Sequence, residues 1–160
     1  MQRVPSDFEV PLAAETAEFV LVPLGPEHNA ADLEAWSSSV SHIRTTPGFA
    51  GRSWPDDPMT LERNGADIRQ HVVDFEGRDG FTYTVLARPG GYVVGCVYVY
   101  PPSRPGFDVQ VRSWVRSSRS ELDGPLYRFV IGWLTSEWPF EAVDYAPRPD
   151  PGASPRATVL

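Results

Sequence analysis

The chain has 160 residues, of which 41% are hydrophobic and 12% aromatic, and its formal net charge is −7. This length and composition suit one domain with a single core and exclude a globally disordered chain. The longest apolar runs, such as residues 92–100, are too short to cross a bilayer, so no membrane segment is predicted.

Residue usage narrows the possible partners further. All 14 basic residues are arginine and face 21 acidic residues, so nucleic-acid binding is not expected outside the arginine-rich stretch 112–119. The single Cys96 excludes an intramolecular disulfide and a cysteine-built metal site, and the three histidines lack metal-ligand spacing, so no metal is predicted. With an N-terminus unlike a signal peptide, these features predict a cytoplasmic protein.

The first third of the chain predicts a surface extension, a strand and a helix. Residues 1–17 are polar and contain proline, and residues 19–24 form a short β-rich run. A turn then leads into a helix on which Leu33, Trp36 and Val40 recur at helical spacing.

A second helix is predicted to start at Asp57 and Pro58, because proline at the first helical position loses no needed hydrogen-bond donor. It runs to about residue 75 and stops at the glycines that follow. Its predicted buried stripe consists of Leu61, Gly65, Ile68, Val72 and Phe75.

Three strands joined by short Gly/Pro-rich turns are predicted at residues 81–87, 92–100 and 107–116, which indicates an antiparallel meander. A third helix follows over about 120–136, capped by either Ser120 or Asp123, and a last short strand spans 140–145. The final strand–helix–strand has the length of a crossover between parallel strands. The predicted fold class is therefore α/β (α+β), with one domain at 18–146 and a disordered Pro-rich tail at 147–160.

This order of elements, and several phrases in the sequence, resemble the GNAT superfamily of acyl-CoA N-acyltransferases. VPLGPEHNAADLEAW is similar to the first strand and helix of that family, YVVGCVYVY to its third strand, and VRSWVR followed by SSRSELDG to its fourth strand and phosphate turn. The resemblance covers about residues 19–146. It implies a GNAT-like mixed sheet and acetyl-CoA as a co-substrate.

The resemblance also implies a cofactor site. In the family, a bulge splays the fourth strand from the fifth, the pantetheine arm pairs with the free backbone in the gap, and helix-start amides receive the pyrophosphate. Carried over to this sequence, the strand contacts would come from Trp114, Val115 and Arg116, and the phosphate turn from Ser117, Ser118, Arg119 and Ser120.

Two departures from the family pattern are visible. Leu122 stands where the phosphate loop usually has its first glycine, so Ser120 or Asp123 serving only as a helix cap is an alternative interpretation. In addition, a Pro-rich tail follows residue 145, where the family continues with a helix and two strands that often carry a tyrosine acid. An uncovered edge strand there would allow a homodimer.

Transfer to an amine needs a base and donors for the developing oxyanion. Glu62, near the start of the second helix, and His71, on its buried side, are the candidate catalytic residues, although a surface role for Glu62 and a structural role for His71 are the alternatives. The predicted function is acyl-CoA-dependent N-acyl transfer, by direct attack, to a small-molecule or protein amine. The alternative is a non-catalytic GNAT-like binding or interaction module.

Overall fold

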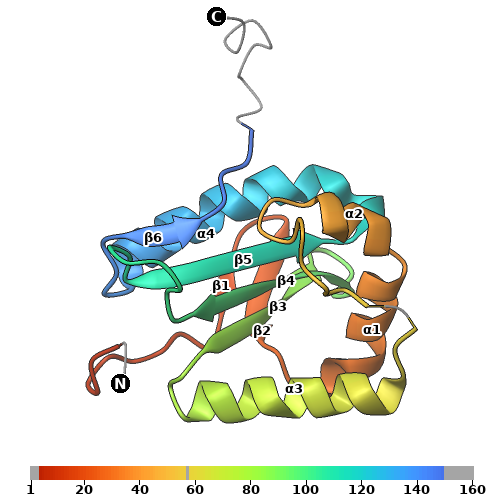
Figure 1. The fold of residues 1–160 in the computed structure, drawn as a ribbon, viewed down its shortest axis with the longest axis horizontal. Helices are drawn as coiled ribbons and strands as arrows, with labels where there is room; N and C mark the ends of the chain where they lie inside the picture. The colour runs from red at the N-terminus through yellow and green to blue at the C-terminus, as the bar shows by residue number, and fades with distance from the viewer. Residues whose placement is uncertain (1–3, 57, 150–160) are drawn as a thin grey trace, which may run out of the picture.

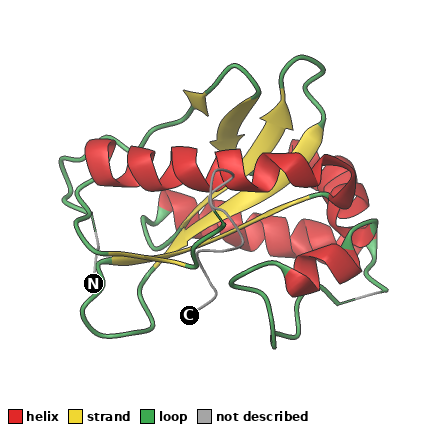
Figure 2. Cartoon of the chain, turned by 90° about the horizontal axis from the view of Figure 1, so that it is seen from above, coloured by secondary structure: helices red, strands yellow, loops and turns green. Residues whose placement is uncertain are grey.

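The computed structural model describes residues 4–56 and 58–149. A six-stranded sheet forms the centre (Figure 1). The helix α4 (Asp123–Glu137) lies along one face, and the remaining helices lie against the other face and one end. Seen from above, this long helix crosses in front of the strands and the other helices lie behind them (Figure 2). The predicted α/β fold class is confirmed.

The strands follow one another across the sheet in chain order, and every neighbouring pair is antiparallel except the last, which is parallel. Both the predicted meander and the parallel crossover are therefore confirmed. The strands are β1 (Ala14–Glu15), β2 (Phe19–Pro23), β3 (Phe81–Ala87), β4 (Val93–Tyr100), β5 (Val109–Val115) and β6 (Val143–Tyr145).

The residues before β2 take part in the fold, whereas the sequence placed them in a surface extension. β1 pairs with β2, and Val4 is only 2% exposed and belongs to the core. The Tyr83 hydroxyl also donates to the carbonyl oxygen of Pro11 at 2.6 Å. Much of this segment therefore lies against the sheet.

The α-helices are α1 (Asn29–Ser37), α2 (Val40–Thr45), α3 (Leu61–Glu76) and α4 (Asp123–Glu137), with short 3-10 turns at η1 (Pro26–His28) and η2 (Ser117–Leu122). Asp57, the predicted cap of α3, lies outside the described residues, and Pro58, the predicted first helical residue, precedes the helix. Thr60 caps the helix instead, its hydroxyl accepting from the Arg63 amide at 3.1 Å. The first residue of the predicted stripe, Leu61, is also exposed.

Of the two starts left open for the third helix, the later one is closer, because α4 begins at Asp123 with Leu122 as its cap residue. Pro125 then falls in the first helical turn, where its missing N–H costs nothing. Residues 117–122 form a separate turn that is kinked at Arg119.

Side chains from the two faces of the sheet form two hydrophobic clusters. The first packs β2 to β6 against α4, with Leu126, Val130 and Leu134 fully buried. The second packs β4 and β5 against α1, α2 and the loop after them, around Trp36 and Trp114. Among the described residues, no helix is long and apolar enough to cross a membrane.

The parallel pair β5–β6 is short. Their register covers only three residue pairs, from Val109 opposite Val143 to Val111 opposite Tyr145. Residues 112–115 of β5 continue past this point, paired with β4 alone. The two strands therefore separate toward the carboxyl end of β5, where η2 and α4 begin.

The separation has a different cause from the one implied by the family resemblance. β5 pairs with β4 in unbroken register from Gln110 to Val115, so it carries no bulge there. The irregularity lies between β3 and β4 instead, at Val85/Leu86. The gap opens because the regular part of β6 ends after three residues.

Candidate cofactor gap and acceptor cleft

The backbone of β5 faces the gap at alternate residues. The carbonyl of Ser113 points to the β6 side, where it accepts a hydrogen bond from Arg148, whereas the amide of Arg116 donates to Val94 in β4 at 2.8 Å. Because backbone groups of successive strand residues point to opposite edges, Val115 faces the gap together with Ser113. Trp114 and Arg116, two of the predicted strand contacts, direct their backbone toward β4.

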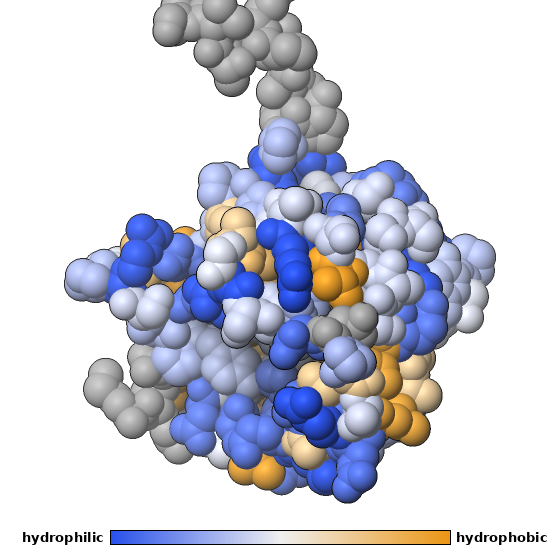
Figure 3. Space-filling view, turned by 45° about the vertical axis from the view of Figure 1, so that its right-hand side comes forward, coloured by the Kyte–Doolittle hydropathy of each residue, from blue (hydrophilic) through white to orange (hydrophobic). Residues whose placement is uncertain are grey.

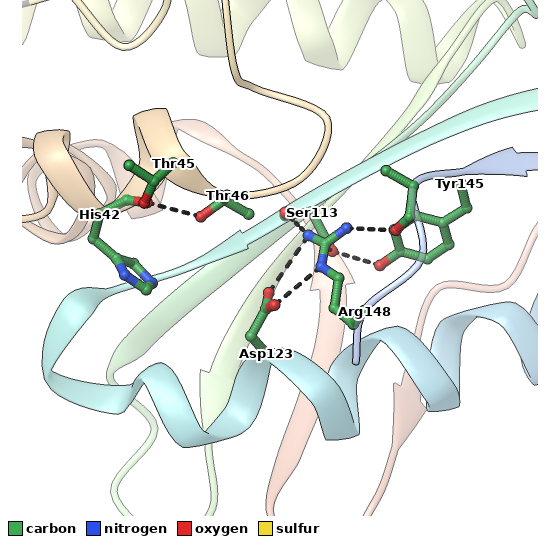
Figure 4. A network of polar contacts seen from close by, with 8 residues as sticks. His42, Thr45, Thr46, Ser113, Asp123, Tyr145 and Arg148 are labelled. Atoms are coloured by element: carbon green, nitrogen blue, oxygen red, sulfur yellow. Dashed lines mark hydrogen bonds and ion pairs between the residues drawn. The ribbon is translucent and has the colours of Figure 1, made fainter. Parts of the chain in front are cut away.

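Arg148 spans the gap between β5 and α4 (Figure 4). Its guanidinium donates to the carbonyl oxygen of Ser113 at 2.7 Å and to the carboxylate of Asp123 at 3.0 Å, and it lies over the rings of Tyr127 and Tyr145. Only 8% of Arg148 is exposed. The predicted disordered tail was set to begin at residue 147, yet Arg148 belongs to the folded part; residues 150–160 lie outside the described residues.

The predicted phosphate turn already uses several of its amides. The Ser117 amide donates to the hydroxyl of Ser39, the residue before α2, at 2.9 Å, and the Arg119 amide donates to the carbonyl of Arg116 at 3.0 Å. Leu122 is buried in the core. Ser117, Ser118 and Ser120 are exposed, so their hydroxyls are accessible to a phosphate.

One buried polar atom close to this turn has no partner. His42, one helical turn beyond Ser39 on α2, has a buried Nε2 without a hydrogen bond to any described residue. Figure 4 draws its ring on the side of α2 that faces α4. The edge of β5 therefore carries backbone groups that β6 does not pair, one of them bonded to Arg148, while the turn offers mainly side chains and α2 one unsatisfied histidine nitrogen.

A cleft opens on the opposite face of the sheet from α4, between α3, the loop after α2, β4 and β5. It consists of two adjoining hollows of about 380 and about 390 Å³, which share His71, Tyr98 and Arg112 in their walls. The loop contributes Phe49 and Trp54, whose rings lie close to Tyr98. The aromatic side chains of this loop line the cleft and also pack against the core.

His71 stands in this cleft at the end of a chain of hydrogen bonds. Its Nδ1 lies 2.9 Å from the hydroxyls of Tyr100 and Thr82, and the Tyr100 hydroxyl donates to Asp74 at 2.8 Å. Because Tyr100 gives its proton to the carboxylate, its oxygen accepts from His71 Nδ1–H, which places the lone pair on Nε2. That nitrogen bonds to no described residue and is available to the cleft.

The protonation state of His71 suits a base. Burial lowers its pKa below the ordinary value of 6.5, and the charges of Asp74 and Asp67 oppose this effect. The imidazole is therefore neutral at neutral pH and able to accept a proton. Glu62, the other predicted catalytic residue, is exposed on the first turn of α3, nine residues and so about 13 Å along the helix from His71, outside the cleft walls.

Comparisons with known proteins agree with this geometry. No protein-family model matches the sequence, and neither does any curated protein. Solved structures do match: the ribosomal-protein-S5-alanine acetyltransferase from Vibrio fischeri aligns with a TM-score of 0.57 and 15% identity over 78% of this chain and 68% of its own. An acetyltransferase of Salmonella typhimurium that modifies the N-terminal serine of ribosomal protein L7/L12 aligns with a TM-score of 0.57 and 10% identity over 79% and 65%.

A third structure was solved with ligands bound. The microcin C7 self-immunity acetyltransferase MccE, in complex with acetyl-CoA and AMP, aligns with a TM-score of 0.58 and 10% identity over 79% of this chain and 66% of its own. The chain has the GNAT fold. It spans about two thirds of the length of these GNAT structures.

Within the GNAT fold of this chain, a buried carboxylate that sequence reasoning missed lies at the base of the cleft. Asp32 on α1 is 6% exposed and accepts from the Asn64 side-chain amide at 3.1 Å, and Asn64 in turn accepts from Trp36 Nε1. Burial raises the pKa of Asp32 to about 6. A signal was present in the sequence, since Asp32 lies four residues before Trp36 and so shares its buried face.

We expect Asp32→Asn to stabilise the protein above about pH 6, because the folded state disfavours the ionised carboxylate. In the unmodified chain the folded pKa of Asp32 exceeds the unfolded value of 3.8. The stability that protonated Asp32 contributes is therefore complete below pH 3.8 and is lost as pH rises through about 6. The variant should gain about 3 kcal/mol at neutral pH. Urea unfolding on both sides of this window measures it, and an unchanged pH dependence of the variant would contradict the assignment.

Proposed function

We propose that this protein is an acyl-CoA-dependent N-acyltransferase that transfers an acetyl group directly to an amine. The observation that carries the proposal is the separation of β5 from β6 after Val111, which leaves Ser113 and Val115 facing a gap beside the start of α4. Structural neighbours that are acetyltransferases, one of them solved with acetyl-CoA, support it.

Each part of the proposed site has a distinct role. The gap-facing backbone of Ser113 and Val115 would hold the pantetheine arm, and the side chains of Ser118, Arg119 and Ser120 would meet the phosphates. Of the family-derived set, Trp114 and Arg116 support this edge from the β4 side, and Ser117 contributes its hydroxyl. Bound acetyl-CoA supplies an activated thioester.

The cleft on the other side of β5 would hold the acceptor. His71 Nε2 takes the proton that the attacking amine loses, and Asp74, through Tyr100, keeps Nδ1 protonated. Phe49, Trp54 and Tyr98 exclude water from the acceptor. The acceptor is an amine of either a small molecule or a protein, and a screen of amines distinguishes the two.

The proposal is tested by turnover. We expect the protein to release free thiol from acetyl-CoA when amines are added, and acetylated product to appear in equal amount by mass spectrometry. Acetyl-CoA without amine, and amine with heat-unfolded protein, are the controls. Thiol release that does not depend on any amine in a panel of amino acids, polyamines, aminoglycosides and peptides would count against the proposal.

A non-catalytic GNAT-like module is the second candidate, and two observations favour it. Arg148 occupies the acceptor group of Ser113 that a pantetheine arm would use, and the amides of Ser117 and Arg119 are already bonded. This alternative predicts either no binding of acetyl-CoA or binding without transfer. Calorimetry with acetyl-CoA and with CoA separates these two cases.

Location and assembly belong to the same proposal. A cytoplasmic enzyme fits the single buried cysteine, and a homodimer through β6 fits the position of this short strand at the edge of the sheet. The face drawn in Figure 3 carries small, separate hydrophobic patches among hydrophilic residues, so it offers no broad apolar contact. Sedimentation analysis of the purified chain decides its oligomeric state.

A further inference from the structure

The two arginines that line the cleft differ from the five described arginines that form ion pairs. Elsewhere five arginines pair with carboxylates, for example Arg116 with Glu34 and Arg104 with Asp144, as expected in a chain with 21 acidic residues. Arg112 and Arg52, which both line the cleft, form no ion pair with any described carboxylate. The cleft therefore holds two arginines without an ion pair among the described residues, and the charge of Asp144, which pairs with Arg104, acts on Arg112 only from a greater distance.

Arg112 is the more constrained of the two. It is half-buried on the central strand β5, and the reoriented Gln110 side chain gives it only a neutral amide oxygen as acceptor. Burial, and then the nearby charge of Arg52, lower the pKa of Arg112. Holding a partly buried cation beside a like charge costs free energy, and a ligand anion would offset that cost.

The opposite wall of the same cleft carries acids and the base. Asp67, His71 and Asp74 recur at helical spacing on one side of α3, and all three line the cleft. Asp67 is exposed, and Asp74 accepts from Tyr100 and Gln70. The cleft thus has two unlike walls. The wall along α3 carries carboxylates and the proton-accepting His71, and the wall along β5 and the loop carries positive charge.

The size of the cleft limits what fits between these walls. Each hollow measures about 380–390 Å³, which is the scale of one small molecule, and aromatic rings line the space between the charged walls. Both hollows contain His71 and Arg112 in their walls. A ligand that spans them presents one end to each wall.

We propose that the acceptor is a small amine that also carries an anionic group, an α-amino acid or its phosphonate counterpart, with Arg112 and Arg52 binding the anion and the amine directed to α3 at His71. The inference rests on the proposed function for the fate of the amine. The binding itself does not require acetyl-CoA. A protein amine without a neighbouring anion fits this cleft poorly.

Binding to the full chain in the absence of acetyl-CoA tests the inference. The standard amino acids and matching aminophosphonates are screened by thermal shift, and the best ligand is then compared by calorimetry with its carboxamide, which keeps the shape and removes the charge. We expect the unmodified chain to bind the carboxamide about tenfold to a hundredfold more weakly than the acid. We expect the Arg112→Gln variant to bind the acid more weakly than the unmodified chain does, by about the same factor. Arg52→Gln, in an exposed position, should show a smaller loss in the same direction.

Arg128→Gln on α4, on the far face of the sheet, is the matched control and should bind like the unmodified chain. The inference is overturned if none of the amino acids or aminophosphonates stabilises the protein. It is also overturned if acid and carboxamide bind equally, or if both cleft variants bind as tightly as the unmodified chain. If Arg112→Gln does not fold, Arg52→Gln and the carboxamide still decide. A ligand that binds in this way but is never acetylated upholds the inference and counts against the proposed function.

Discussion

Replacing His71 with glutamine should lower kcat for acyl transfer by about a hundredfold to ten-thousandfold, the usual contribution of a positioned base. The variant keeps a polar side chain of similar reach but has no nitrogen that accepts a proton from an amine. Steady-state rates with acetyl-CoA and an acceptor found in the screen measure the effect. With the unmodified chain, the rate should fall only at pH values below the ordinary histidine pKa of 6.5, because burial lowers the pKa of His71.

Two further variants show whether His71 acts as that base. Tyr100→Phe removes the acceptor of the Nδ1 proton, so we expect a smaller loss, about tenfold, together with a shift of the acidic limb of the pH–rate profile. His28→Gln, at a histidine outside the cleft walls, is the control and should retain the rate. A full rate in His71→Gln together with its loss in Glu62→Gln would assign the base to Glu62 instead.

Arg148→Ala should destabilise the folded state by about 3 kcal/mol, because the change leaves the Ser113 carbonyl and the Asp123 carboxylate without their shared partner. The Arg148 side chain is 2% exposed and that of Asp123 21%, so little water can replace the lost donors. Equilibrium unfolding in urea measures the difference in the free energy of unfolding.

Arg104→Ala is the matched control for this change. Arg104 also donates to an aspartate, Asp144, at 2.7 Å and also lies over an aromatic ring, that of Phe107, but its side chain is 63% exposed. Removing it should therefore cost less than about 1 kcal/mol. Similar losses in the two variants would show that burial of Arg148 adds nothing to the pair.

Local patterns were enough to predict the centre of the fold. The alternation of Phe81, Tyr83 and Val85 and the short turns between strands predicted β3 to β5, and these strands pair as expected. The start of α3 was missed because Asp57–Pro58 and Thr60 are both good helix starts, and only tertiary packing chooses between them. β1 was missed because two residues carry no periodicity and gain their partners only from β2.

The site was harder to predict because its residues come together from distant parts of the chain. His71 could be placed on the buried side of a helix, but its partner Tyr100 lies 29 residues away and Arg148 lies 35 residues from Ser113. A buried aspartate such as Asp32 looks like a solvated charge until the fold removes water from it. No spacing rule reports such convergence. The catalytic and cofactor residues therefore stay predictions.

Hydrogen exchange of the chain with and without saturating acetyl-CoA tests the central claim most directly. A pantetheine arm lying along the open edge of β5 must shield the backbone there, so we predict slower exchange of the Ser113 and Val115 amides and release of the contact between Arg148 and Ser113. Unchanged exchange along residues 112–116, while the rest of the sheet behaves identically in both samples, would contradict an acyl-CoA site between β5 and β6.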